Sequence, residues 1–417
     1  MKTRIIILIL FFGSALRTYS QDPSDTTLLT LAEVVSMAKA KSIDSRQAST
    51  VKETRFWEWR TYRANYQPQL SLQGVLPGYS KTFAEVMQPN GTVDFRAVRN
   101  NNSSLNLSFS QSISQTGGTI FGTTQMQRFD DYDRNSVLYN GVPYALGYSQ
   151  PLFQFNKLKW DKQIEPIKYE ESKSEYVESM EKIAMNASEY FFDLLLAQVN
   201  LQIAETNLSN TDNILKVANM KLELGRITRN EILQLKLEQV KAQKAVGIAK
   251  RDMEIATLNL RSYTGLASTE KIALTAPQTT INMQVNTDKV LAEAFANRSD
   301  ALAFSRRIAE AKRDVAKARG ENGLNATLTA RLGFSKSASR MMQVYNSPQN
   351  QQLLQLELDI PIMDWGRSKS RTKTAEATRQ FTEYAVEQDK QNFTQEIITQ
   401  VTLYDMMQNQ LVLTANA

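Results

Sequence analysis

Apolar residues recur with a heptad period in the middle of the chain. A first series has leucines seven residues apart with small residues between them, at Leu194, Leu201, Leu208, Leu215, Leu222, Ala197, Ala204, Thr211 and Ala218. A second series follows Gly225 at alternating steps of three and four residues, at Ile232, Leu235, Gln239, Ala242, Val246, Ala249, Met253, Ala256, Leu260 and Tyr263. Such steps place residues on one face of a helix. The pattern predicts a long helical hairpin over residues 158–264, and a simple two-stranded zipper is the alternative.

A strict period of two marks the segments between the helical regions. Its apolar members are Leu105, Leu107, Phe109, Tyr144, Leu146, Tyr148, Ala326, Leu328, Ala330, Leu332, Leu354, Leu356 and Leu358, with a shorter copy at Leu70 and Leu72. The pattern predicts strands near residues 68–76, 103–128, 143–153, 324–336 and 351–362. Alternation over about ten residues is typical of barrel strands that face lipid on one side and a wet lumen on the other. A soluble sheet packed on helices has the same alternation.

The order of these elements repeats, which indicates an internal duplication. A helical pattern, strands and a long helix follow one another in residues 21–275 and again in residues 276–417. An offset of 256 pairs Val34 with Val290, and an offset of 212 pairs Asp193 with Asp405. The second helix, predicted over residues 366–417, should then turn near residue 437 (225 + 212). We therefore expect the sequence to be a fragment, and the alternative is that the second half departs from its own repeat.

The ends and the composition restrict the class of protein. Residues 1–20 combine Lys2 and Arg4 with a short apolar run, as in a secretory signal peptide. The formal net charge of +6 falls to +3 when the three charges Lys2, Arg4 and Arg17 are removed, which gives no support to nucleic-acid binding. The chain has no cysteine and no histidine. We therefore predict no catalytic residues, no metal site and no cofactor.

Several short motifs occur in an order that resembles the TolC-type outer-membrane efflux channels. They are Leu29-Thr30-Leu31-Ala32-Glu33, Gln67-Pro68-Gln69-Leu70-Ser71-Leu72, Gln150-Pro151-Leu152-Phe153, Phe191-Phe192-Asp193-Leu194-Leu195-Leu196-Ala197-Gln198 and Ile360-Pro361-Ile362-Met363-Asp364-Trp365-Gly366-Arg367. Each motif is weak alone, but the order and the duplication are specific. The resemblance covers nearly the whole mature chain.

The resemblance implies a mixed α and β fold of long helical hairpins and transmembrane β-strands. In this fold a homotrimer shares a 12-stranded β-barrel, four strands from each copy, and its helices form a periplasmic tunnel. Four strands alone cannot close a membrane barrel, so sharing between copies is also expected on physical grounds. The implied location is the outer membrane of a Gram-negative bacterium. The implied function is a passive export conduit in a tripartite efflux or type I secretion system. Its partners would be outer-membrane lipid, a periplasmic adaptor (membrane fusion) protein and an inner-membrane pump of the RND or ABC type.

Two sets of residues are candidates for function. In the family the hairpin tip contacts the adaptor, and the matching turn here contains Leu224, Gly225, Arg226 and Thr228. Gly225 is expected to end the first helix in the left-handed conformation and Thr228 to cap the next one. Glu357 and Asp359 lie on the polar face of a predicted strand, facing the lumen or lying at a solvated rim.

Two loops are expected between the strands. Residues 81–102, with Asn90-Gly91, are predicted to be an extracellular loop without an assigned role. Residues 117–141 look like an extra hairpin and loop relative to the second half of the chain. Asp130, Asp131 and Asp133 suggest calcium binding, but the glycine and glutamate spacing of an EF-hand is missing, so a solvated loop is favoured.

Two other functions are compatible with the sequence. The first is a secreted periplasmic coiled-coil scaffold or adaptor component without a pore, although adaptors usually have one hairpin rather than two similar halves. The second is an enzyme with a helical bundle, for which no compact polar constellation is visible. The exported substrate is not indicated by the sequence.

Overall fold

The computed structural model describes residues 26–266, 271–277 and 283–415. The predicted signal peptide lies outside the described residues. The chain divides into two units, of which unit 1 comprises Met1–Ala48 and Ser179–Ile281 and unit 2 comprises Ser49–Glu178 and Asn282–Ala417. Within the described ranges, no helix is long and apolar enough to cross a membrane.

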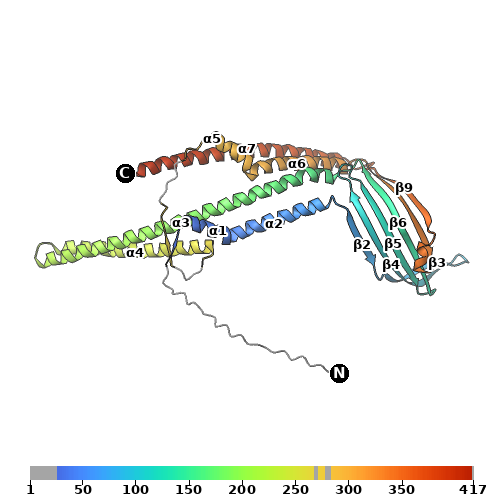
Figure 1. Cartoon of the computed structure of the whole chain (residues 1–417), viewed down its shortest axis with the longest axis horizontal. Coiled ribbons are helices and arrows are strands. Elements are labelled where there is room, and N and C mark those ends of the chain that lie inside the picture. Colours follow the sequence, from blue (N-terminus) through green and yellow to red (C-terminus); the bar gives the residue numbers. More distant parts are fainter. Residues whose placement is uncertain (1–25, 267–270, 278–282, 416–417) are drawn as a thin grey trace, which may run out of the picture. The chain divides into compact units, whose positions relative to one another are not determined.

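Long helices and a single large sheet account for most of the chain (Figure 1). The helices are α1 (Leu31–Lys41), α2 (Ile43–Ala64), α3 (Lys157–Glu223), α4 (Arg229–Thr264), α5 (Thr287–Asn297), α6 (Ser299–Glu321), α7 (Arg367–Ala415) and the short η1 (Met341–Tyr345). The strands are β1 (Thr26–Leu29), β2 (Gln69–Val75), β3 (Tyr79–Met87), β4 (Val93–Ser112), β5 (Thr119–Asp131), β6 (Ser136–Leu152), β7 (Lys271–Leu274), β8 (Asn325–Ala338) and β9 (Gln349–Asp359). The mixed fold with long helical hairpins is the predicted class.

The helical hairpin of unit 1 forms as the heptads predict. Every residue of both predicted seams is buried or half-buried, and the residues between them are mostly exposed. Two polar pairs cross the hairpin: the Gln239 amide donates to Asp212 over 2.8 Å, and the Lys250 ammonium lies 3.6 Å from Glu205. The seam therefore packs α4 against the second half of α3, from Leu194 to Leu222.

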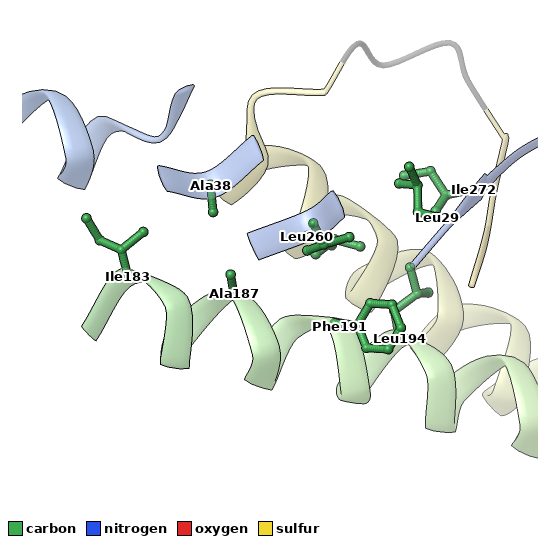
Figure 2. Packing of buried hydrophobic residues seen from close by; sticks show 9 residues of the cluster. Leu29, Ala38, Ile183, Ala187, Phe191, Leu194, Leu260 and Ile272 are labelled. Carbon is green, nitrogen blue, oxygen red and sulfur yellow. The ribbon is translucent and has the colours of Figure 1, made fainter. Parts of the chain in front are cut away.

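The core of unit 1 lies where α1 packs on α3 and α4. Ile183, Ala187, Phe191 and Leu194 follow one face of α3 and face Ala38, Leu260, Leu29 and Ile272 (Figure 2). A parallel pair, β1 with β7, covers one end of this core. The Gln198 side chain joins α3 to β7, because its amide donates to the Ile272 carbonyl over 2.9 Å and accepts from the Leu274 N–H over 3.3 Å.

The helices of unit 2 pack through a second core and several ion pairs. Phe304 of α6 and Ala294 of α5 lie against α7 at Val386, Phe393 and Ile397. The Arg306 guanidinium of α6 makes two hydrogen bonds with Glu171 of α3, at 2.5 and 2.8 Å, and Glu171 is only 8% exposed. These bonds raise the pKa of Arg306 above its ordinary value.

The duplication appears in the element boundaries. Helices α1 and α2 begin at Leu31 and Ile43, and α5 and α6 begin 256 residues later, at Thr287 and Ser299. The same offset takes the start of β2 at Gln69 to the start of β8 at Asn325. Three pairs of element starts therefore have the offset of 256 that the scattered sequence identities suggested.

Seven strands form one antiparallel sheet in the order β2-β4-β5-β6-β8-β9, with β3 also paired to β4. Strand β2 pairs with Ser104–Ser110 of β4 and β3 pairs with Val93–Asn101, so β2 and β3 share one position beside β4. The sheet is therefore six strands wide.

Two sequence predictions about this sheet are wrong. The single strand predicted at residues 103–128 is two strands, because β4 ends at Ser112 and β5 begins at Thr119. Residues 81–102 form most of the β3–β4 hairpin rather than a loop. The β4–β5 turn was missed because the apolar residues change from odd to even positions across it. The β3–β4 hairpin was missed because both of its faces carry polar residues.

Candidate functional site

One face of the sheet is apolar across all six strand positions. The pairing register places one exposed row on this face: Leu70 opposite Phe109, Phe109 opposite Gly122, Gly122 opposite Leu146, and Leu146 opposite Leu332. Other large exposed side chains on the same face are Leu72, Leu105, Leu107, Ile120, Tyr144, Leu354, Leu356 and Leu358. So wide an exposed apolar surface indicates contact with a membrane or with other protein.

The opposite face is polar and mostly uncharged. Thr119, Ser149, Thr329 and Gln355 lie opposite one another on four successive strands. A side-chain ladder crosses β4, β5, β6 and β8: Gln127 donates to Asn102 over 2.7 Å, Asn140 donates to Gln127 over 3.5 Å, and Ser337 donates to Asn140 over 3.1 Å. This face is suited to line water.

A β-bulge in β6 keeps its apolar side chains on the same face of the sheet along the whole strand. The register shifts by one residue between Gly141 and Tyr144, at the position of Pro143. Before the bulge the odd-numbered residue Gly141 pairs with Met126, and after it the even-numbered Leu146 pairs with Gly122. Since a bulge adds one residue to one strand, it exchanges the faces of the residues that follow.

The turn between β4 and β5 is bonded to the segments where strands meet helices. The Asn156 amide donates to the Ser114 carbonyl over 3.0 Å, and the Gln150 amide donates to the Thr116 carbonyl over 2.9 Å. Gln111 donates to the Tyr66 carbonyl over 3.0 Å, and the Tyr66 hydroxyl donates to the Leu158 carbonyl over 2.7 Å. The β4–β5 turn is thus fixed at the helical end of the sheet.

The opposite end of the sheet carries a charged, hydrogen-bonded cluster. Arg128 pairs with Asp130 at 2.7 Å, Asn101 donates to Asp130 over 2.8 Å, and Arg99 pairs with Asp133 at 2.8 Å. Arginine groups pair with these carboxylates and the Asn101 amide hydrogen-bonds Asp130. The described segments contain no cluster of acidic residues arranged for a metal ion. The favoured prediction of a solvated loop is wrong for Asp130, because this residue lies in β5 and is only 7% exposed.

Both strand-to-helix exits carry an exposed aromatic residue with a left-handed backbone. Phe153 follows β6 with φ of 63°, and Trp365 follows β9 with φ of 56°; they are 72% and 92% exposed. The offset between them is 212, which is the repeat offset of this part of the chain (365 − 153). Bulky residues are uncommon in this conformation, which costs about 1–3 kcal/mol for each residue. Both residues lie in motifs quoted from the sequence, but their backbone conformation was not predicted, because a backbone angle leaves no signal in composition.

The two candidate acidic residues lie close together on the polar face. Glu357 is opposite Thr327 and Asp359 is opposite Asn325, at the helical end of β8 and β9. Both are exposed and border a cavity of about 430 Å³ with Gln154 and Glu321. The position on the polar face agrees with the sequence prediction.

The hairpin tip adopts the predicted turn. Gly225 has φ of 69°, its N–H bonds the Leu222 carbonyl over 2.9 Å, and the Arg226 N–H bonds the Lys221 carbonyl over 2.9 Å. Thr228 and Glu231 form a capping box at the start of α4. Leu224 is 71% exposed, and Arg226 has no side-chain partner among the residues that the structure describes. The tip thus presents one apolar and one cationic side chain to solvent.

A second apolar stripe runs along each arm of the hairpin, outside the seam. On α3 it comprises Leu196, Val199, Ile203, Ile214 and Val217, and on α4 Leu233, Leu237, Val240, Ile248, Ile255 and Leu258. These side chains are between 42% and 62% exposed and are spaced at heptad-like intervals. Heptad-like spacing of exposed apolar residues indicates further helix packing partners.

Comparison with known proteins identifies the family. The family model described as outer membrane efflux protein matches residues 117–266 and 290–417. The chain belongs to the outer membrane efflux protein family. This is a family of transport proteins and not of enzymes. The two matched segments fall in the two halves of the duplication.

One curated member and several solved structures are similar to the chain. The pyoverdine export outer membrane protein OpmQ of Pseudomonas putida is 24% identical over 195 residues, which are 47% of this chain and 41% of that protein. The match therefore spans about two-fifths of the length of this relative. The structure of CusC shares the fold with a TM-score of 0.63 at 18% identity, covering 93% of this chain and 78% of that one. The outer membrane protein VceC of Vibrio cholerae gives a TM-score of 0.62 at 14% identity, covering 93% and 82%.

Proposed function

We propose that this chain is the outer-membrane channel subunit of a tripartite efflux or type I secretion system, acting as a homotrimer. The observation that carries the proposal is the two-faced sheet, apolar and exposed on one side and polar on the other, in a chain of this family. Strands of this kind suit a barrel between lipid and water. The channel conducts substrate passively, and the energy comes from an inner-membrane pump of the RND or ABC type.

Both edges of the sheet support the sharing of one barrel between copies. An open sheet edge in lipid leaves backbone N–H and C=O groups without hydrogen-bond partners, which costs several kcal/mol for each group. Strands β2 and β9 are the two edges of the sheet. Strand β2 follows a helix and β9 precedes one, so neighbouring copies meet with antiparallel edges, as the rest of the sheet requires.

The proposed orientation follows from the position of the helices. All four connections between strands and long helices lie at one end of the sheet, so this end faces the periplasm. The exposed apolar stripes of α3 and α4 then pack against helices of neighbouring copies and form part of a tunnel wall. Small seam residues such as Ala204, Ala218 and Ala242 allow this close lateral packing.

The tip residues Leu224, Gly225, Arg226 and Thr228 are proposed to contact the periplasmic adaptor. Their exposure and the absence of an internal partner for Arg226 among the described residues support this role. The variant Arg226→Glu should weaken adaptor binding measured by site-specific cross-linking in cells. Arg229→Glu, at the first position of α4, is the control. Equal cross-linking of the two variants and the wild type would contradict the contact.

The channel proposal is tested on protein extracted from the outer membrane of its own cells in mild detergent. The mass of the complex is measured by light scattering and the mass of the subunit by mass spectrometry. We expect three subunits in each complex and ion conductance after reconstitution into planar bilayers. A soluble monomer or dimer without conductance would contradict the proposal and favour a coiled-coil scaffold.

A further inference from the structure

The sheet is wider than the sequence pattern predicted. The family resemblance implied four strands from each copy and the alternation predicted five strand segments, but the described sheet has six strand positions. The second half contributes β8 and β9, and the first half contributes β2 with β3, β4, β5 and β6. Strand β2 corresponds to β8 by the offset of 256, and β6 corresponds to β9 because both lead into a long helix. Strands β4 and β5 are therefore the additional pair.

We infer that β4 and β5 belong to the membrane wall, so that a trimer encloses a barrel of eighteen strands (3 × 6). This inference rests on the proposed function. It concerns how many strands each copy contributes and how wide the resulting channel is.

Continuous pairing is the first argument for this width. Strand β4 pairs with β5 over Asn100–Ser112, and β5 pairs with β6 over Thr119–Asp131. Strand β6 then pairs with β8 over Tyr139–Leu152. Strands β4 and β5 thus stand between β2 and β6, and β2 cannot reach β6 without the loss of two complete ladders.

The distribution of side chains is the second argument. Leu105, Leu107 and Phe109 of β4 and Ile120 of β5 lie on the same exposed apolar face as Leu146 and Leu332. On the opposite face, Asn102 and Gln127 of this pair belong to the polar ladder that continues to Asn140 and Ser337. An extracellular flap would not need an apolar side in register with the other four strand positions.

The even number of strands allows closure by copies of the same chain. Each of the six positions reverses direction relative to its neighbour, so β9 of one copy meets β2 of the next in antiparallel orientation. The exposed leucines of both edge strands, Leu70, Leu72, Leu354, Leu356 and Leu358, continue the apolar face to the edges. A second copy is therefore the partner that fits each edge.

A wider barrel changes what the channel can pass. Barrel diameter grows roughly linearly with strand number, and barrels of about 16 to 18 strands leave an aqueous channel. Eighteen strands give a diameter about 1.5 times that of twelve strands. With a lumen face of serine, threonine, asparagine and glutamine, this part of the conduit suits large, hydrated, polar cargo.

The test uses site-directed spin labelling of the trimer in lipid vesicles. The chain has no native cysteine, so each introduced cysteine is unique. Labels at Leu107→Cys and Ser108→Cys in β4 and at Ile120→Cys and Phe121→Cys in β5 should alternate between access to lipid-soluble oxygen and access to a water-soluble nickel chelate. The matched control pairs are Leu328→Cys with Thr329→Cys in β8 and Leu356→Cys with Glu357→Cys in β9.

The outcomes separate this inference from the proposed function. Alternation in all four strands supports the eighteen-stranded barrel. Alternation in β8 and β9 with uniform water access in β4 and β5 would overturn the inference and leave the channel proposal intact. Loss of alternation in β8 and β9 as well would overturn the channel proposal and the inference with it.

A deletion variant provides a second measurement. Removal of residues 88–131 joins Met87 to the native turn before β6. Strands β2 and β3 then occupy the first strand position together, and their combined length is similar to that of β6. We expect a narrower channel that excludes smaller polyethylene glycols than the wild type does. Where the barrel limits the current, the conductance should fall to about half that of the wild type. Unchanged conductance and cut-off would show that β4 and β5 lie outside the wall. If the variant does not fold, the spin-label result decides.

Discussion

At the scale of single residues, two glycines of the hairpin differ in backbone conformation. Gly225 adopts φ of 69° at the tip, where a Cβ atom would meet no atom within 4 Å. Gly247 lies inside α4, also in open space, but with ordinary helical backbone. Any effect of a methyl group at these sites therefore comes from the backbone alone.

We expect Gly225→Ala to destabilise the hairpin by about 1 kcal/mol, because an L-residue is strained in the left-handed region. Gly247→Ala should stabilise it by about 0.5–1 kcal/mol, since alanine is the better helix former. Thermal unfolding followed by circular dichroism measures both. Shifts of the same sign in the two variants would show that the turn is not left-handed in solution.

The pair formed by Arg306 and Glu171 is the most buried ion pair among the described residues, with side-chain exposures of 24% and 8%. Arg306→Leu leaves the Glu171 carboxylate buried without its cation, so we expect a loss of about 3 kcal/mol in the free energy of unfolding. Arg313→Leu is the control on the same helix, since its partner Asp314 is 57% exposed, and should cost less than about 1 kcal/mol. Equal losses would indicate that the Arg306 pair is solvated.

At the scale of elements, Glu376 links α6 and α7. Its carboxylate lies 2.8 Å from Arg319 of α6 and 2.8 Å from Lys373 of α7. Hydrogen bonds from Arg319 and then from Lys373 hold the pKa of Glu376 well below its ordinary value of 4.5. The stabilisation from this group is therefore complete above the ordinary value and is lost as the pH falls through the lower folded-state value.

We expect the wild type to lose stability more steeply than Glu376→Gln as the pH falls below 4.5, since glutamine cannot titrate. Melting temperatures measured between neutral pH and pH 3 test this, with Glu321→Gln at the exposed end of α6 as the control. Parallel pH profiles for the wild type and Glu376→Gln would show that the Glu376 carboxylate does not stabilise the contact between α6 and α7.

Elements differ in how well their sequence predicts them. The two seams of α3 and α4 were recognisable because each repeats over many turns and is buried by the adjacent arm of the same hairpin. The outer parts of β3 and β4 were missed because Lys81, Glu85 and Arg99 interrupt the apolar positions that would mark a strand. Continuous backbone pairing between β3 and β4 holds these charged residues in the hairpin.

At the scale of the whole molecule, the charges on the polar face determine how the proposed channel treats ions. Most residues on this face are neutral, and Glu357 and Asp359 lie together near its helical end. Carboxylates at a pore entrance attract cations. The polar face also carries Arg331 on β8, opposite Leu353, so the acidic pair does not act alone.

We expect the double variant with Glu357→Gln and Asp359→Asn to lower the preference for cations, measured as a shift of the reversal potential in a salt gradient across a planar bilayer. The control is Asp94→Asn, in the outer hairpin and 57% exposed. An unchanged reversal potential in the double variant would place these two acidic residues outside the conducting path.

The sequence by itself determined the periodic parts of this protein. Heptads specify helices and their partner within the hairpin, period-two alternation specifies two-faced strands, and the offset of 256 specifies the duplication. These features follow from local side-chain spacing, which each segment carries on its own.

Only the tertiary structure decided how many strands lie side by side and where the chain changes direction between them. The change from β4 to β5 depends on bonds from Asn156 and Gln150 to a turn more than thirty residues away in sequence. The unchanged apolar face along β6 depends on a bulge defined by its neighbours. Pairing between strands is a long-range property, because any two strands of the same alternation can pair until register, turns and anchoring contacts select one arrangement.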